Sequence, residues 1–353
     1  MSPTPMPKVI LAAILEQQRR ALVIDEIEPP ERLQCGQVLV KVLCTSICGS
    51  QIGEIDGVKG PDRFLPHLLG HEGCGEVLAA GDGVRYVRTG DRVVLHWRKG
   101  RGIEAAPAGY RWRGKPLNAG FVTTFSDYAV VSENRLTAIP NDFNPHWAAL
   151  FGCAVTTAFG ILDNNAGLKI GESIVVLGTG GVGLSVVQGA ALRAACPIVA
   201  VDRFDNRLDL AMQLGATHRI NAGTEALEPR LRQIFGDQGV DVAVENTGDP
   251  DIIALAYRMT GPTGRTVLVG VPRADQTIAI HSLPLHFGKV LTGSHGGQAD
   301  PAVDIPRYVR LCLSGRLCLE PLLTDRFALE NINEAIARMR DGRIAGRCLI
   351  EPR

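Results

Sequence analysis

A glycine-rich hexapeptide at residues 178–183, GTGGVG, constrains the fold of this chain more than any other segment. It follows the apolar run 174–177 and leads into an uncharged stretch that ends near Leu192, so it lies between a predicted buried strand and a predicted helix. Its glycines match the spacing G-x-G-x-x-G, which allows a tight turn, a close approach of backbone to a pyrophosphate, and close packing of the helix. The N-terminus of that helix would offer N–H groups to the anion. The segment therefore predicts a dinucleotide-binding unit rather than a simple mobile turn.

An acidic residue about twenty positions later supports this interpretation. Asp202 ends the next predicted strand, 198–202, where a carboxylate would accept a hydrogen bond from the adenosine ribose 2′-hydroxyl. A carboxylate there repels a 2′-phosphate, so NAD is favoured over NADP. Arg203 leaves the other possibility open, because an arginine at this point can bind that phosphate or lie against the adenine. The predicted cofactor-binding residues of this unit are Gly178, Gly180, Gly181, Val182, Gly183, Asp202, Arg203 and Arg207.

The strand and helix patterns divide the chain into two kinds of structure. Up to about residue 150, short apolar runs such as 38–43 and 90–95 are broken by glycine, proline and aspartate, which predicts a mainly antiparallel β domain. From Gly171 onward, strands and helices alternate, which predicts a parallel sheet with crossover helices. After about Asp300 we expect two helices, 305–314 and 332–339, and a last strand at 348–350.

Charge and cysteine content exclude several classes of function. The 353 residues carry 37 basic and 37 acidic side chains, so no net field favours nucleic acid or an anionic membrane. Nine irregularly spaced cysteines do not form a disulfide pattern, and no secretory signal is evident, so we expect a cytoplasmic protein with a small-molecule partner. The uncharged stretch 173–192 has the length of a membrane span, but its glycines favour the strand, turn and helix described above.

Three further segments resemble one enzyme family. Gly70-His71-Glu72, with Gly75, Gly81 and Val84 behind it, resembles the zinc-containing alcohol dehydrogenase signature of the medium-chain dehydrogenase/reductase superfamily. The segments 47–50 (ICGS) and 151–158 (FGCAVTTA) resemble the first and third metal segments of that family. The resemblance covers nearly the whole chain. It implies an α/β protein with a GroES-like, mainly-β catalytic domain in residues 1–154 and 298–353, and a Rossmann NAD-binding domain with a doubly wound parallel sheet in residues 155–297.

The resemblance implies one catalytic zinc on Cys48, His71 and Cys153. Two thiolates and one imidazole suit Zn²⁺, and three protein ligands leave the fourth position open for substrate. Each residue taken alone would more often be a buried small side chain or a turn residue. Glu72, beside the ligand histidine, would approach the metal or orient its ligands.

The family also supplies roles for residues around the metal. Ser50 would accept the proton of the alcohol and begin a relay to solvent, unless it is a capping serine. Thr157 would lie near the nicotinamide or simply pack in a helix. The remaining implied positions are Val269 and Val271 at the cofactor, Arg347 at its pyrophosphate, and Trp97 and Phe125 in the substrate pocket, although both aromatics could be core residues.

The chain departs from the family pattern at several positions. Gln51 replaces a common aspartate near the zinc, and Gly53 replaces a histidine that finishes the relay in many members, so water or Glu54 would have to take the last step. Residues 97–118 contain no cysteine, where many members bind a structural zinc with four, so we expect a single zinc per chain. Three cations in that region, Arg98, Lys99 and Arg101, form either a solvated loop or a contact for a polar or anionic substrate group.

These observations predict a zinc-dependent alcohol dehydrogenase. It would transfer hydride between a primary or secondary alcohol, activated by zinc, and NAD, giving an aldehyde or ketone reversibly. The alternatives are an NAD-dependent polyol, sugar or aminocyclitol dehydrogenase, a zinc-free quinone or enoyl reductase, and a catalytically silent NAD-binding protein. A homodimer or homotetramer is expected from the family alone.

Overall fold

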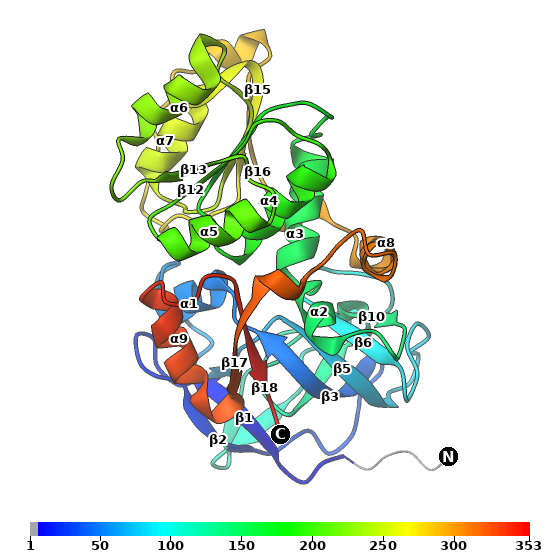
Figure 1. The fold of residues 1–353 in the computed structure, drawn as a ribbon. Coiled ribbons are helices and arrows are strands. Elements are labelled where there is room, and N and C mark those ends of the chain that lie inside the picture. Colours follow the sequence, from blue (N-terminus) through cyan, green and yellow to red (C-terminus); the bar gives the residue numbers. More distant parts are fainter. Residues whose placement is uncertain (1–5) are drawn as a thin grey trace. The chain divides into compact units, whose positions relative to one another are not determined.

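The computed structural model describes residues 6–353 of a chain that divides into two compact units. Unit 1 contains the chain up to Thr156 together with Asp300–Arg353, and unit 2 is Thr157–Ala299. In Figure 1, unit 1 combines the segments coloured from blue to the green of α2 (Pro145–Leu150) with the orange and red end of the chain, and unit 2 contains the helices α4 to α7 (within residues 181–259). The second unit is therefore inserted into the first along the sequence.

Unit 1 is built mainly from antiparallel strands. Its seven-stranded sheet has the order β10-β6-β5-β3-β18-β17, and β9 also pairs with β3. Within this sheet only β17 and β18 run parallel. The strands are β3 (Gln37–Ser46), β5 (Glu72–Ala80), β6 (Arg92–His96), β9 (Tyr128–Ser132), β10 (Leu136–Ile139), β17 (Leu323–Ala328) and β18 (Arg347–Glu351). This arrangement confirms the mainly-β fold predicted for this part of the chain.

Smaller strands and short helices complete unit 1. A three-stranded sheet, β2-β1-β4, consists of β1 (Ile10–Leu15), β2 (Val23–Ile27) and β4 (His67–Leu68), while β7 (Tyr110–Trp112) pairs with β8 (Lys115–Leu117). The helices are α1 (Gly49–Ile55), α2 (Pro145–Leu150), α8 (Pro301–Leu313) and α9 (Ile332–Arg340), and α3 (Ala154–Gly160) crosses the unit boundary. Helix α8 begins four residues before the predicted start at 305, because Asp300 caps it through Ala302 N–H and Pro301 fits its first turn.

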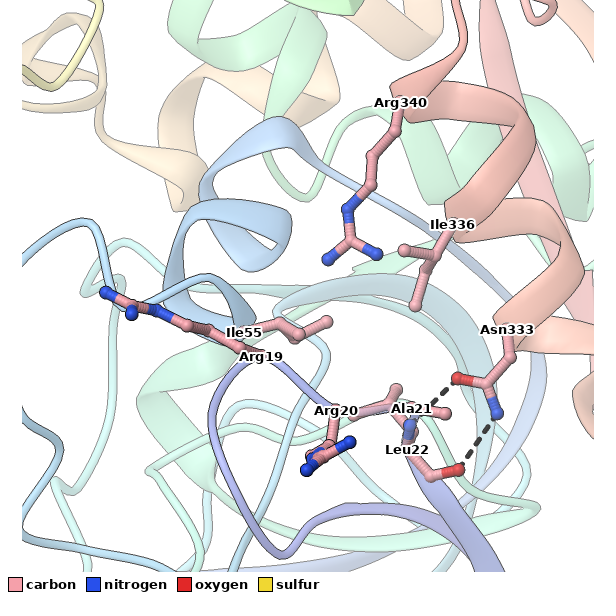
Figure 2. A pocket seen from close by; sticks show the side chains of 8 residues that line it. All are labelled: Arg19, Arg20, Ala21, Leu22, Ile55, Asn333, Ile336 and Arg340. Atoms are coloured by element: carbon pink, nitrogen blue, oxygen red, sulfur yellow. Dashed lines mark hydrogen bonds between the residues drawn. The ribbon is translucent and has the colours of Figure 1, made fainter.

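Helix α1 is held at its C-terminal end by cationic residues from two other segments. Arg19 donates its backbone N–H to the carbonyl of Ile55 at 2.7 Å, and Arg340 of α9 forms an ion pair with Asp56. Figure 2 shows the pocket of about 150 Å³ at this junction, where the Asn333 side chain makes two hydrogen bonds to the backbone of Leu22. Its lining consists of Arg19, Arg20, Ala21, Leu22, Ile55, Asn333, Ile336 and Arg340. These contacts fix the helix that follows the first predicted zinc ligand.

Unit 2 is a doubly wound α/β fold. Its six strands are all parallel in the order β13-β12-β11-β14-β15-β16, so the strand order reverses beside β11, the first strand in the chain. They are β11 (Ile174–Leu177), β12 (Ile198–Asp202), β13 (His218–Asn221), β14 (Val240–Glu245), β15 (Thr260–Leu268) and β16 (Val290–Gly293). The crossover helices are α4 (Gly181–Leu192), α5 (Asp205–Gln213), α6 (Leu227–Phe235) and α7 (Pro250–Met259). Ligands of such sheets bind outside the carboxyl ends of the strands at the reversal point, which here is the end of β11.

The uncharged stretch 173–192 forms strand β11, the glycine turn and helix α4. Gly178 has φ +89°, which a residue with a side chain rarely adopts, and a Cβ on Gly183 would overlap the carbonyl oxygen of Gly178. Both positions therefore require glycine for the turn to close. Within residues 6–353 no helix combines the length and apolar character needed to cross a membrane.

Candidate metal centre and cofactor site

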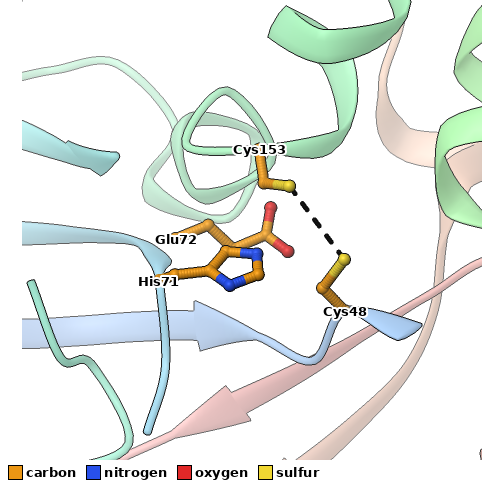
Figure 3. Close-up of side chains that lie close together, drawn as sticks. All are labelled: Cys48, His71, Glu72 and Cys153. Atoms are coloured by element: carbon orange, nitrogen blue, oxygen red, sulfur yellow. Dashed lines mark hydrogen bonds between the residues drawn. The ribbon is translucent and has the colours of Figure 1, made fainter. Parts of the chain in front are cut away.

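Four side chains from three segments of unit 1 converge on one point. Cys48 lies between β3 and α1, His71 precedes β5, Glu72 begins β5, and Cys153 lies between α2 and α3. One ligand atom from each lies within 4.8 Å of the others. Figure 3 shows the two thiols, the imidazole and the carboxylate facing one another. The structure thus brings together the three predicted ligands and the neighbouring glutamate.

The donor set fits a zinc ion. The sulfurs of Cys48 and Cys153 are 4.0 Å apart, close to the separation of about 3.8 Å that two Zn–S bonds at a tetrahedral angle require. The Nε2 atom of His71 is buried and has no hydrogen-bond partner among residues 6–353, which is costly unless a ligand satisfies it. Cys48, His71 and Cys153 would hold the ion, and Glu72 lies within the same cluster.

The Cys48 thiol differs from the buried thiol of Cys74, which also lies in unit 1. Its hydrogen bond with Cys153, together with His71 and Arg347, holds the pKa of Cys48 well below its usual value in spite of burial. Burial instead raises the pKa of Cys74, in the neighbouring strand, to about 12. The thiolate is the form that binds metals. The surroundings of Cys48 therefore favour the ligand form, whereas those of Cys74 favour an inert buried thiol.

The carboxylate of Glu72 is fixed by a buried arginine. Glu72 is fully buried and forms an ion pair with Arg347, of which only 3 % is exposed. The other carboxylate oxygen accepts a hydrogen bond from Ala154 N–H at 3.4 Å. Burial lowers the pKa of Arg347, and the nearby Cys48 opposes that change. Arg347 is thus part of the metal cluster's surroundings, and its assignment to the cofactor pyrophosphate stays a prediction.

A glycine brings the third ligand segment close to the sheet. A Cβ at Gly152 would overlap the carbonyl oxygen of Leu95 and lie 2.6 Å from Cβ of Glu72. Only glycine lets this segment approach the start of β5 so closely. Packing therefore requires glycine at position 152, directly before the predicted ligand Cys153.

Helix α1 presents two different faces beside Cys48. Gln51 and Ile55 are buried, whereas Ser50 and Glu54 are exposed. The side-chain oxygen of Gln51 is buried without a hydrogen-bond partner among the described residues. Ser50 thus lies two residues after a predicted ligand on the open face of the helix. Its role in proton transfer stays a prediction.

In unit 2, the predicted cofactor residues gather at the carboxyl ends of the parallel strands. One carboxylate oxygen of Asp202 accepts hydrogen bonds from Thr179 N–H (2.8 Å) and Thr179 Oγ1 (3.1 Å), which ties the end of β12 to the glycine turn. Nη1 of Arg207 lies 3.8 Å from the same oxygen, and the Arg203 guanidinium lies over the ring of Phe204. Val269 and Val271 follow the end of β15.

Other predicted residues take less specific positions. Thr157, in α3, is buried, and Phe125 is 1 % exposed inside a hydrophobic cluster of unit 1. Trp97 packs at the edge of another cluster, and the guanidinium of Arg98 lies over its ring. In the basic loop, Lys99 forms an ion pair with Glu104 at 3.6 Å. The substrate-pocket role of the two aromatics and the loop's contact with substrate stay predictions.

Sequence reasoning overlooked two buried histidines beside the segment of His71 and Glu72. His67 lies four residues before His71 and makes close contacts with Asp62 and Glu54. His96, the last residue of β6, pairs in register with Glu72. Neither belongs to a motif of the resemblance, so only their spacing from the ligand segments could have suggested them.

His96 is buried in its neutral form. Its Nδ1 lies 2.7 Å from the carbonyl oxygen of Arg98 and its Nε2 lies 2.9 Å from Thr137 Oγ1, so one nitrogen donates and the other accepts. Burial lowers the pKa of His96 to about 4. A free histidine titrates near about 6.5, so between pH 6.5 and 4 the unfolded chain binds a proton that the folded chain excludes. The contribution of His96 to the free energy of unfolding is therefore fully present above about pH 6.5 and is lost as the pH falls toward 4.

From pH 7 to pH 4, we expect the free energy of unfolding of the wild type to fall by about 3 kcal/mol more than that of His96→Gln. Urea unfolding at half-unit pH steps measures the difference between the two proteins, in which shared titrations cancel. His218→Gln, which removes an exposed histidine, should show no such trend. A difference that stays constant over this range would mean that His96 is not held neutral.

Comparisons with known proteins agree with this geometry. Residues 34–141 match the alcohol dehydrogenase GroES-like domain family, and residues 181–314 match the zinc-binding dehydrogenase family. Alcohol dehydrogenase-like 3 of Arabidopsis thaliana is 30 % identical, over 96 % of this chain and 95 % of its own length. S-(hydroxymethyl)glutathione dehydrogenase of a Synechocystis strain is 32 % identical, over 94 % and 97 %. The crystal structure of benzyl alcohol dehydrogenase from Acinetobacter calcoaceticus superposes with a TM-score of 0.88 at 30 % identity, covering 98 % of this chain and all of that one.

The two family matches extend over both units. Residues 34–141 include Cys48 and His71, and residues 181–314 begin in the glycine turn, whereas Cys153 lies between the two matched regions. The fold is that of a GroES-like domain joined to a Rossmann-type domain, and the relatives are dehydrogenases. The chain is therefore an oxidoreductase that belongs to the zinc-containing alcohol dehydrogenase family of the medium-chain dehydrogenase/reductase superfamily.

Proposed function

We propose that this protein is an NAD-dependent alcohol dehydrogenase with one catalytic zinc per chain and no structural zinc. The observation that carries the proposal is the convergence of Cys48, His71 and Cys153, in which Nε2 of His71 is buried and has no hydrogen-bond partner among residues 6–353. When bound, zinc supplies Lewis acidity toward an alcohol or carbonyl oxygen, and NAD supplies the hydride acceptor. The substrate is a primary or secondary alcohol, and the reverse reaction reduces an aldehyde or ketone.

The chain's own residues hold the metal and move the proton. Arg347 forms an ion pair with the buried carboxylate of Glu72. The carboxylate can therefore stay ionised beside the ligands without being a buried, unpaired charge. Ser50, as a neutral hydroxyl, accepts a proton from the substrate hydroxyl and donates its own proton onward. The glycine turn and Asp202 bind the dinucleotide in unit 2.

The test is NAD reduction with a panel of primary alcohols, secondary alcohols and polyols, together with the zinc content of the same sample. We expect turnover of at least one simple alcohol and about one zinc per chain. Turnover restricted to polyols or sugars would instead identify a polyol dehydrogenase. Absence of both turnover and zinc would contradict the proposal and leave a silent NAD-binding protein.

The choice of NAD rests on the charge of Asp202. Asp202→Asn keeps an oxygen that can accept the Thr179 hydrogen bonds but removes the negative charge. We expect kcat/KM with NAD to fall about tenfold, because a charged hydrogen bond to the ribose becomes a neutral one, and kcat/KM with NADP to rise about tenfold. Initial rates with both cofactors measure this exchange of preference.

Asp205→Asn is the matched control for this substitution. Asp205 is an exposed acid in the first turn of α5, three residues after Asp202. We expect it to leave the cofactor preference unchanged. A wild-type protein that prefers NADP would show that Arg203 and Arg207 determine the preference instead.

A homodimer or homotetramer is part of the proposal. Strand β16 lies at an edge of the parallel sheet, and Leu283, Phe287 and Val290, in or just before it, are exposed. Exposed apolar side chains beside a free strand edge are typical of subunit contacts. Light scattering during size-exclusion chromatography determines the number of chains.

A further inference from the structure

A second cluster of titratable side chains lies in unit 1, outside the metal centre. It consists of Glu54 on α1, Asp62 in the loop after it, and His67 on β4. Nε2 of His67 lies 2.8 Å from Asp62 Oδ2 and 3.8 Å from Glu54 Oε1. The imidazole is buried, whereas 45 % of the Glu54 side chain is exposed to solvent. The cluster thus connects a buried ring with a carboxylate at the surface.

Both nitrogens of the His67 ring contact oxygen atoms. Its Nδ1 lies 2.9 Å from the carbonyl oxygen of Leu68, and its Nε2 faces the two carboxylates. The cluster therefore places one buried imidazole against two carboxylates, one of which is exposed to solvent.

Neutral groups of Gln18 and Phe64 make further hydrogen bonds to residues of the cluster. Phe64 N–H donates to Asp62 at 2.8 Å, and the Gln18 side chain accepts from Asp62 N–H at 3.2 Å and donates to the Glu54 carbonyl at 3.5 Å. Burial acts to raise the pKa of Asp62, but the bonds from Phe64 and His67 outweigh it, so this pKa is lowered. The Arg63 guanidinium lies over the Phe64 ring. Asp62 therefore stays ionised and holds His67 beside Glu54.

Helix α1 connects this cluster to the metal centre. Ser50 and Glu54 are four residues apart in α1, so they lie one above the other on the same, exposed face, with Cβ atoms about 6 Å apart. A single water can bridge a hydroxyl and a carboxylate at such a separation. At position 53, where many family members have the histidine that ends the relay, this chain has only a hydrogen atom as side chain. Glu54 is the titratable group nearest to Ser50 along this face.

Resting on the alcohol dehydrogenase activity proposed above, we propose that Glu54 is the terminal proton acceptor of the relay and that His67 and Asp62 position it. Oxidation of an alcohol by NAD gives a carbonyl compound, NADH and one proton. Ser50 takes the hydroxyl proton of the substrate and releases its own, so the serine is unchanged. The carboxylate of Glu54 becomes a carboxylic acid and then returns to carboxylate by giving the proton to bulk water.

The principal test is Glu54→Gln, which keeps the size of an exposed side chain and removes its basicity. We expect kcat for alcohol oxidation to fall about 10- to 100-fold, the lower part of the range for a proton-transfer group, with zinc content and NAD affinity unchanged. The ratio of kcat in H₂O to kcat in D₂O should rise to about two or more, because proton transfer then limits turnover. Glu26→Gln, at an exposed glutamate of β2, is the control and should leave all four quantities unchanged.

A second variant tests the same role by restoring it. A Cβ at Gly53 would meet only Val58, at 3.6 Å, so a side chain fits there. We expect Gly53→His in the Glu54→Gln background to recover at least about tenfold of the lost kcat, which a merely structural role of Glu54 would not allow. Independently of turnover, ¹⁵N spectra of the histidine rings should show a hydrogen bond at Nε2 of His67 that is weakened in Asp62→Ala, which removes the acceptor at 2.8 Å.

Several outcomes would overturn this assignment. Full activity of Glu54→Gln with an unchanged D₂O effect would exclude the carboxylate from the relay while leaving the dehydrogenase activity intact. Loss of zinc or NAD binding in that variant would show a structural role. A second metal ion per chain that Glu54→Gln releases would mean that the cluster binds a cation and is not a base. Failure of the wild type to oxidise any alcohol would refute the proposed function itself, a result separate from all three.

Discussion

Replacing Cys153 with alanine is expected to remove the zinc and lower kcat by at least about 10³-fold. The remaining donors, Cys48 and His71, are too few for a tetrahedral site with an open position, and the Lewis acidity of zinc contributes several kcal/mol to catalysis. Metal analysis after dialysis should show zinc falling from about one per chain to near zero. Turnover is measured on the same sample.

Cys74→Ala is the matched control for the loss of a buried thiol. Cys74 is fully buried in the neighbouring strand β5, but its raised pKa marks it as a neutral thiol. We expect this variant to lose some stability through the small cavity that it creates, and to keep both zinc and turnover. Retention of zinc by Cys153→Ala would show that the cluster in Figure 3 is not the metal site.

Replacing Ser50 with alanine is expected to lower kcat about 10²- to 10⁴-fold while zinc content and NAD affinity remain close to those of the wild type. The substitution removes the only hydroxyl on the exposed face of α1 and keeps a residue that favours helix. Steady-state kinetics with the best alcohol of the panel, zinc analysis and NAD titration measure the three quantities.

Ser50→Thr keeps a hydroxyl on the same Cβ and is expected to retain activity within about tenfold of the wild type. The pair therefore separates loss of the hydroxyl from disturbance of the helix beside Cys48. If Ser50→Ala also weakened zinc binding, the serine would have a structural function. Unchanged turnover in this variant would remove Ser50 from the relay, and with it the link from substrate to Glu54.

The motifs were readable from the sequence because each is fixed by local backbone geometry. The turn at 178–183 follows from glycine spacing, and the structure confirms a parallel sheet with Gly178 at φ +89°. The helix at 301–313 begins four residues before the predicted start, because an N-cap aspartate followed by proline sets its first turn. Errors of this kind lie at the ends of elements, where a single capping residue decides the boundary.

The sequence by itself determined the family and the two kinds of domain and predicted the zinc ligands, because these depend on residue types at fixed spacings. Only the tertiary structure decided which residues meet across long separations: the pair Glu72–Arg347, 275 positions apart, and the cluster of Glu54, Asp62 and His67. Such contacts follow from how strands and loops pack, for which a local pattern of residues carries no signal. The structure also distinguishes the thiol of Cys48 from that of Cys74. Cys48 lies beside other ligands and has a lowered pKa, whereas Cys74 lies in an apolar interior and has a raised pKa.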